Sequence, residues 1–348
     1  MFVECSEHVL TPFHAAINIL VALFVAASYT PPIRQLAQRD DHGATGISGW
    51  YILLLILGVN SHLMAWIFSA QSFNIFACIS LGELQGRKAF SALAVILPLA
   101  IQFLAAATFL VSFMLSRRRQ QIARTEHLPS TEKKSGTART SPSNGLILAT
   151  SIIHMAIFLA PAVLLILLVR EELSDEGWTA VLAMWYSVLA TALGVFPSLA
   201  AFIPQIRLMI HRHREGLRVD QGALSITSLA LQGASFTALA VSQIYASLNL
   251  QSTDAHLLPV FSEEWWSYIL WSYGLAAGWI SLAFSQLIVL TVLLRLGGGG
   301  TLHMMRLGSR KRLFQVCCGV TAVYGLVVAR YIVPTACQGI YGLLVELL

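Results

Sequence analysis

Long apolar runs, separated by short polar segments, make up most of the chain. The runs are roughly 20 residues long, which is the length that an α-helix needs to cross a bilayer. They are continuous rather than alternating, and this favours spanning helices over a β-barrel. The pattern predicts an all-α polytopic membrane protein with seven transmembrane helices, at residues 12–33, 47–68, 91–115, 146–169, 180–208, 223–247 and 265–294.

An eighth apolar stretch, residues 313–333, differs from the seven runs. It follows a glycine run and a basic cluster, it contains Arg330, and Pro334 comes directly after it. A spanning helix, a helix on the membrane surface and a tail all fit this pattern, and the sequence leaves the three alternatives open.

Composition agrees with a membrane protein. The chain of 348 residues is 56% hydrophobic and 11% charged, with a mean hydropathy of +0.70. A soluble domain would have about a quarter of its residues charged. The net charge of +5 does not indicate nucleic-acid binding, because the basic residues lie in the loops between the apolar runs. We therefore expect an integral multi-pass protein in contact with the lipid bilayer.

The positive charges predict an orientation. The loops after the first, third, fifth and seventh runs hold 18 of the 22 Lys and Arg residues. Such residues gather in cytoplasmic loops, so the N-terminus is expected on the non-cytoplasmic side. No Lys or Arg precedes Arg34, so the first run lacks the basic start of a cleavable signal peptide and is expected to stay as a helix. A vacuolar, lysosomal or other endomembrane location and the plasma membrane are all compatible with this pattern.

Two short segments repeat each other. The sequence FIPQIR at residues 202–207 is followed by a basic loop and by Ala223-Leu224-Ser225, and YTPPIR at 29–34 is followed by a polar loop and by Gly46-Ile47-Ser48. Runs one to three and five to seven then form two equivalent halves. Run four lies between them, so both halves insert in the same orientation, as a 3+1+3 parallel repeat.

The repeat divides the chain into five parts. They are a first three-helix bundle at 1–115, a flexible cytoplasmic linker at 116–145, a linker transmembrane helix at 146–179, a second three-helix bundle at 180–295 and a C-terminal tail at 296–348. The segment 116–145 is interpreted as a linker because it is rich in Ser, Thr, Pro and charge. Cys5 and Cys78 fall on the same non-cytoplasmic side, which permits a disulfide between them.

The Pro-Gln-Ile-Arg segment, its basic loop and the Leu-Ser-Ile restart resemble a PQ-loop repeat. The 3+1+3 plan is similar to the PQ-loop/MtN3-SWEET family of membrane proteins. Pro32 stands where the family pattern has glutamine. The resemblance implies a carrier of a small polar solute, an amino acid or a sugar, that works by alternating access between the two bundles. A non-transporting membrane receptor or sorting factor on the same scaffold is the alternative function.

The motif residues Pro31, Pro32, Pro204 and Gln205 have two interpretations. A proline removes one backbone donor from a helix and kinks it, so these positions are candidate hinges for a cytoplasmic gate. They also fit helices that simply end before a loop. Gln205 is a candidate for hydrogen bonding across helices.

Polar side chains inside the apolar runs are candidates for a substrate cavity, because such groups are costly in hydrocarbon unless they have partners. Trp279 is added because an indole ring stacks on sugars and cations. Each of them is also compatible with a bond or packing between helices. The candidates are Asn18, Asn60, His62, Gln102, Gln232, Gln243, Trp279 and Gln286, with His154 in the linker helix.

Some chemistry is excluded or disfavoured by the sequence. The seven runs contain no Asp or Glu, which favours a facilitator or a histidine-coupled carrier over carboxylate-driven cotransport. No cysteine spacing, histidine pattern or nucleophile set indicates a metal site, a cofactor or an enzyme. We expect no cofactor and no catalytic residues, and the sequence is compatible with a homo-oligomer.

Overall fold

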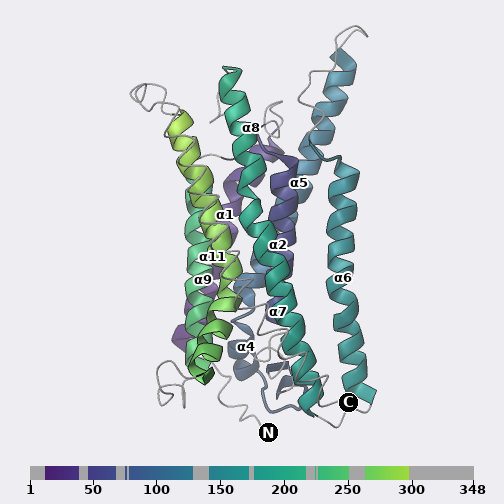
Figure 1. Ribbon diagram of the computed structural model, residues 1–348, viewed down its shortest axis with the longest axis vertical. Helices are drawn as coiled ribbons and strands as arrows, with labels where there is room; N and C mark the ends of the chain where they lie inside the picture. Colours follow the sequence, from purple (N-terminus) through teal and green to yellow (C-terminus); the bar gives the residue numbers. More distant parts are fainter. Residues whose placement is uncertain are drawn as a thin grey trace.

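The computed structural model describes residues 12–38, 46–67, 75–76, 78–127, 141–171, 176–216, 224, 226–250 and 263–297. Its elements are all helices, with no strand among the described residues, and most of them lie lengthwise along one another (Figure 1). Their bounds are α1 Pro12–Ala37, α2 Gly49–Ile67, α4 Arg87–Leu93, α5 Leu97–His127, α6 Asn144–Glu171, α7 Glu176–Ala200, α8 Phe202–Arg214, α9 Ile226–Leu250 and α11 Glu263–Gly297. The predicted all-α class is confirmed, while the stretch 313–333 lies outside the described residues.

Within the described part of the chain, five segments are long and apolar enough to cross a membrane, namely Ala15–Ala37, Gly49–Ile67, Leu97–Ile122, Leu189–Arg214 and Ala276–Leu296. Two shorter apolar helices, Asn144–Ala160 and Ile226–Ser242, fall on the fourth and sixth predicted runs. Large apolar side chains such as Leu20, Leu104 and Ile153 are more than half exposed, as expected where a helix faces lipid rather than water. The chain is therefore built as a membrane protein.

The third predicted span differs from the observed helix at both ends. The run 91–115 is broken at 94–96, and α5 begins at Leu97 with Pro98 in its first turn, where a missing N–H costs no helical bond. At its other end α5 continues to His127, into the segment predicted to be a flexible linker. Arg117 Nη1 donates to Pro142 O at 2.7 Å, so the residues just before α6 are also attached to α5.

The motif prolines do not end their helices. Pro31 and Pro32 lie inside α1, which continues to Ala37. The predicted run 180–208 is divided at Ala201 between α7 and α8, although Ala201 keeps helical dihedral angles of φ −57° and ψ −36°. Pro204 lacks the N–H that would bond Ala200 O, which accounts for a break at this point. The chain then stays helical to Arg214, so the interpretation as simple helix ends is wrong for these positions.

We call α1, α2 and α5 the first helix group and α7, α8, α9 and α11 the second helix group. In the first group α5 contacts both α1 and α2, and in the second group α11 contacts α7, α8 and α9. Between the groups α1 contacts α9 and α2 contacts α7. The linker helix α6 contacts α2 and α7 and lies at one edge of the bundle (Figure 1).

Side-chain bonds give the helix directions. Asn18 meets Ser242 while Ser28 meets Ser235, so α1 and α9 are antiparallel. Bonds from Gln102 to Tyr29 and from Arg119 to the end of α1 make α1 and α5 parallel. The same comparison shows that α2 and α7 are antiparallel and that α7 and α11 are parallel.

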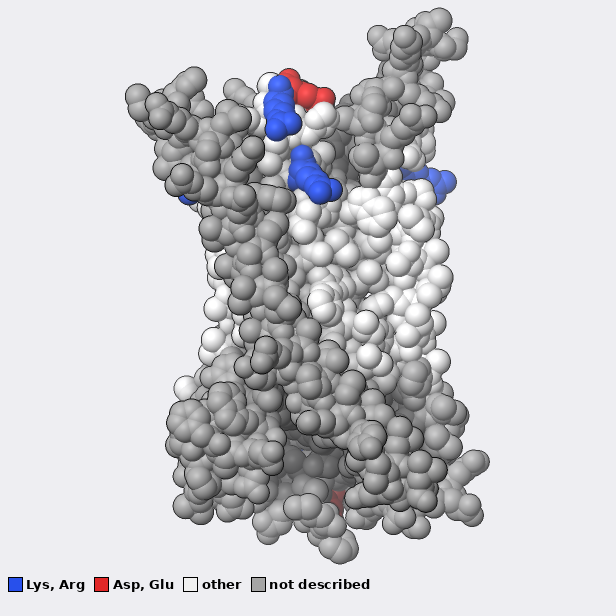
Figure 2. All heavy atoms as spheres, viewed as in Figure 1, with Lys and Arg blue, Asp and Glu red and all other residues white. Residues whose placement is uncertain are grey.

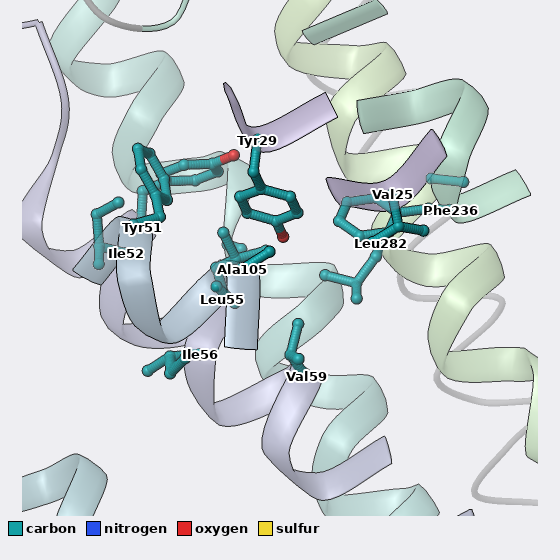
Figure 3. Packing of buried hydrophobic residues seen from close by; sticks show 14 of the residues in the cluster. Val25, Tyr29, Tyr51, Ile52, Leu55, Ile56, Val59, Ala105, Phe236 and Leu282 are labelled. Atoms are coloured by element: carbon teal, nitrogen blue, oxygen red, sulfur yellow. The ribbon is translucent and has the colours of Figure 1, made fainter. Parts of the chain in front are cut away.

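A single large cluster of buried apolar residues joins the two groups. Figure 3 shows part of it, with Tyr29 from α1, Tyr51 from α2, Ala105 from α5, Phe236 from α9 and Leu282 from α11. Lipid tails are as apolar as these side chains, so close packing and hydrogen bonds hold such helices together rather than the hydrophobic effect.

The described charges lie at the ends of the bundle. Figure 2 shows Lys and Arg near one end of this face, with none on the described surface in the middle. The arginines of this end follow or close α1, α5, α8 and α11, whereas Arg87 and Lys88 start α4 at the opposite end (Figure 1). The uncharged middle is what the bilayer interior requires.

Candidate functional site

Gln205 joins the two helix groups. Its side chain is 1% exposed, and Nε2 donates to Gly46 O at 2.9 Å while Oε1 accepts from Ser48 N at 2.9 Å. Ser48 directly precedes α2, where the first backbone N–H groups have no partner within the helix. Gln205 therefore acts as a cap for α2, supplied by the second group.

The sequence identified the residues on both sides of this contact but did not predict that they bond each other. Gln205 belongs to the second motif, and Gly46 and Ser48 belong to the restart after the first motif. In the first motif Pro32 takes the place of the glutamine and is buried in α1. Proline has no side-chain amide, so it cannot form the same cap, and the matching residues 223 and 225 lie outside the described part of the chain.

Two amide side chains are buried without partners. Asn60 on α2 is 2% exposed and Gln232 on α9 is 0% exposed, and no donor or acceptor lies within bonding distance of either terminal group. A buried polar group without a partner costs about 1–3 kcal/mol. Natural structures keep few such groups, and within a membrane they mark candidate contacts for a polar ligand.

His62 and Trp279 come together as a pair. Their ring centroids lie 5.2 Å apart, and His62 Nε2 lies 3.1 Å from Ser198 Oγ on α7. Trp279 also stacks on Phe236 of α9, with centroids 6.5 Å apart. Trp279, on α11, therefore contacts both α2 and α9, the two helices that carry the unpartnered amides.

The other predicted cavity residues bond neighbouring helices. Gln102 Nε2 donates to the Tyr29 hydroxyl at 2.6 Å, and Gln286 Nε2 donates to the Tyr51 hydroxyl at 2.8 Å. Asn18 Oδ1 accepts from a serine hydroxyl of α9 at 2.7 Å. These three side chains have the contacts of helix–helix hydrogen bonds, which was their alternative interpretation. The side chain of Gln243 lies outside the described residues.

His154 attaches the linker helix. Its Nε2 lies 2.9 Å from Ser61 Oγ on α2, and its ring packs edge-to-face on Phe158 with centroids 4.7 Å apart. Ser61 directly precedes His62, so His154 bonds the residue next to His62 on α2.

Sequence reasoning missed the small residues on the partner helices. Ser198 and Gly194 are four residues apart on α7, and Gly278 and Ser281 lie on α11. Small residues spaced three or four apart in a spanning helix allow close approach of a second helix. That spacing was the signal that could have found them. Among the described residues no group of three or more His, Cys, Asp or Glu could hold a metal ion.

Comparison with known proteins gives no relative. No protein-family model matches the chain, and no curated protein or solved structure matches it. The functional argument therefore rests on the residues and their geometry.

The cap formed by Gln205 can be tested by replacing it with leucine. The Gln205→Leu variant leaves Gly46 O and Ser48 N without their partner, and we expect the free energy of unfolding in detergent to fall by about 1–3 kcal/mol. The exposed loop residue Gln85 supplies the control, and Gln85→Leu should change the value by less than about 0.5 kcal/mol. Equal stability of the two variants would contradict the cap.

Proposed function

We propose that the chain is a PQ-loop carrier that moves a small polar solute, an amino acid or a sugar, by alternating access between two three-helix bundles. The observation that carries this proposal is the pair of buried, unpartnered amides, Asn60 and Gln232. They lie on the second helix of each bundle, no group in the described part of the chain bonds them, and a bound solute would supply the partners.

The arrangement of helices supports the repeat. In each group the third helix lies between the first and the second, and each first helix contacts the second helix of the other group. Both of these contacts are antiparallel, and α2 also contacts α11 and α8. Such reciprocal contacts are what two copies related by an axis along the membrane normal would make. In this scheme α7 and α8 together are the first helix of the second bundle, and α6 is the linker helix.

The site chemistry supports a polar solute. An amide both donates and accepts hydrogen bonds, so Asn60 and Gln232 can replace the water that a hydroxyl, amine or carbonyl loses on entering the membrane. No carboxylate lies in the seven predicted runs to fix a cation. We therefore favour a facilitator, or a carrier coupled through a histidine.

Exchange of the two buried amides for leucine tests the carrier. In purified protein reconstituted into vesicles and assayed with a panel of sugars and amino acids, Asn60→Leu and Gln232→Leu should lower uptake by at least about tenfold, the factor that one lost hydrogen bond can give. Their melting temperatures should stay equal or rise, because an unpartnered amide destabilises the folded protein.

Gln102→Leu provides the contrast, since it removes a bond to Tyr29 and should lower stability. Loss of stability in all three variants would identify Asn60 and Gln232 as structural. Solute binding without uptake in the wild-type protein would instead indicate a receptor or sorting factor.

Alternating access requires helices that change shape, and Pro204 supplies the break. The backbone bond missing at Pro204 would let α8 bend relative to α7, and the Gln205 cap would link that motion to the start of α2. Replacement of Pro204 by alanine restores one backbone donor, so α7 and α8 can form one continuous helix.

The hinge is tested by measuring solute uptake by variants that fold normally. Pro204→Ala should slow transport by roughly tenfold, which corresponds to about 1.4 kcal/mol in the barrier. Pro98→Ala is the matched control, because Pro98 lies in a first turn where no helical bond is lost. Unchanged transport by Pro204→Ala would exclude the hinge.

The charges and one disulfide support an orientation with the N-terminus outside the cytoplasm. The basic ends of α1, α5, α8 and α11 would be cytoplasmic. Cys78, near α4 at the opposite end, is disulfide-bonded, and disulfides persist in oxidising compartments. Plasma, vacuolar, lysosomal and other endomembranes agree with this placement.

Single cysteines at two exposed positions test this orientation. In sealed vesicles with the cytoplasmic face outward, Arg118→Cys on α5 should react with a membrane-impermeant maleimide. Arg87→Cys on α4 should react only after detergent is added. The reverse pattern, measured against the wild-type background, would place the N-terminus in the cytoplasm.

A further inference from the structure

The ring of His62 occupies a slot on the second helix group. A Cβ atom added to Gly194 on α7 would lie 2.7 Å from His62 Cε1, which is closer than real Cβ contacts. A Cβ atom added to Gly278 on α11 would overlap the imidazole ring. The ring therefore fits between two helices only because both positions lack a side chain.

The end of the slot fixes which nitrogen carries the proton. Ser198 Oγ donates its one hydrogen to Gly194 O at 2.7 Å. It can then only accept from His62, whose Nε2 lies 3.1 Å away. A neutral His62 must therefore be the tautomer with hydrogen on Nε2. Ser285 of α11 bonds Ser198 O, so the acceptor is held by both helices of the slot.

The residues described around His62 include no negative charge that would balance an imidazolium. Trp279 covers one side of the ring, and Ser61 on α2 itself is bonded to His154 of α6. Ser198 and the two glycines also lie against the ring. The described spanning segments of α2, α6, α7, α9 and α11 contain no Asp or Glu, so a charge on His62 is disfavoured in the slot.

We propose that His62 is a positioning residue that locks the first helix group to the second on the non-cytoplasmic side. As a neutral imidazole it fills the slot between Gly194 and Gly278, and it must leave the slot for this side to open. Protonation of His62 favours the open side. The idea of a gate rests on the proposed carrier function, whereas the slot and its response to pH do not.

The position of His62 along α2 separates this lock from the Gln205 cap. The Gln205 cap lies at the start of α2, and His62 lies 13 residues after Gly49, or about 20 Å at the helical rise. Asn60 lies two residues before His62, between the two contacts along the helix. The contacts thus close the bundle at two levels, with an unpartnered amide between them.

Alanine at the glycine positions tests the slot without any solute. The readout is hydrogen–deuterium exchange of residues 58–66 and 194–201 in the full-length protein in lipid nanodiscs. Gly278→Ala should expel the ring and speed exchange by roughly fivefold, the factor for about one lost hydrogen bond. Gly233→Ala on α9 is the matched control, because its added Cβ meets nothing closer than 3.5 Å.

A double variant separates the lock from a general packing defect. In the His62→Ala background the ring is absent, so adding Gly278→Ala should give little further change in exchange or in melting temperature. If Gly278→Ala fails to fold, recovery of folding in the double variant supports the slot. An additive effect of the two substitutions, or a Gly278→Ala variant that behaves like Gly233→Ala, overturns it.

The pH dependence of hydrogen–deuterium exchange tests whether His62 is the group that responds to acid. After correction for the intrinsic pH dependence of exchange, acidification from pH 7.5 to 5 should speed exchange of the same segments in the wild-type protein by roughly fivefold. His62→Gln keeps a donor but cannot be protonated, and should abolish the response. His154→Gln should retain it. A response that survives in His62→Gln, or its absence from the wild-type protein, overturns the role of His62 as a pH-sensitive lock.

These outcomes are independent of the carrier assay. A slot and a pH response found in a protein that moves no solute would leave the lock intact and contradict only the proposed transport.

Discussion

Every polar group inside a bilayer has to find its hydrogen-bonding partner within the protein, because hydrocarbon offers none. Most of the described polar side chains meet this requirement by bonding a neighbouring helix. Gln102 bonds Tyr29, Gln286 bonds Tyr51, and serines of α9 bond Asn18 and Ser28. Among the predicted cavity residues whose side chains the structure describes, Asn60 and Gln232 are the ones with both ends of the amide unsatisfied. The distinction between structural and functional polar groups in this chain follows from that one constraint.

The second motif combines two effects at neighbouring positions. Pro204 interrupts the backbone bonds between α7 and α8, and Gln205 returns two bonds to the start of α2. A missing backbone bond in one helix group thus lies next to a residue that forms two hydrogen bonds with the other group. Because Pro32 replaces the glutamine in the first motif, the two halves differ at the position where the repeat is otherwise most similar, and a carrier built in this way would open with unequal contributions from its halves.

The sequence predicted the helices better than their ends. Apolar length was a sound guide, since hydrocarbon thickness sets it. The arginine-rich continuation of α5 was interpreted as linker, because composition cannot distinguish a polar helix that leaves the membrane from a flexible segment. The break at 94–96 and the division at Ala201 both lie close to a proline, so their cause was present in the sequence, but the position of each break depends on how the flanking turns pack.

The candidate site was also predicted only in part from the sequence. The sequence by itself determined that the chain is a bundle of membrane helices, that its charges lie at the ends, and that a small set of polar residues lies within the spans, because these properties depend only on residue type and spacing. Only the tertiary structure decided which of those residues have hydrogen-bond partners in the protein. The partners of His62 and Gln205 come from other helices, more than 100 residues away in the chain. The small residues Gly194 and Gly278 are visible in the sequence, but which side chain fills the space that they leave depends on helix rotation, and no local pattern encodes that rotation.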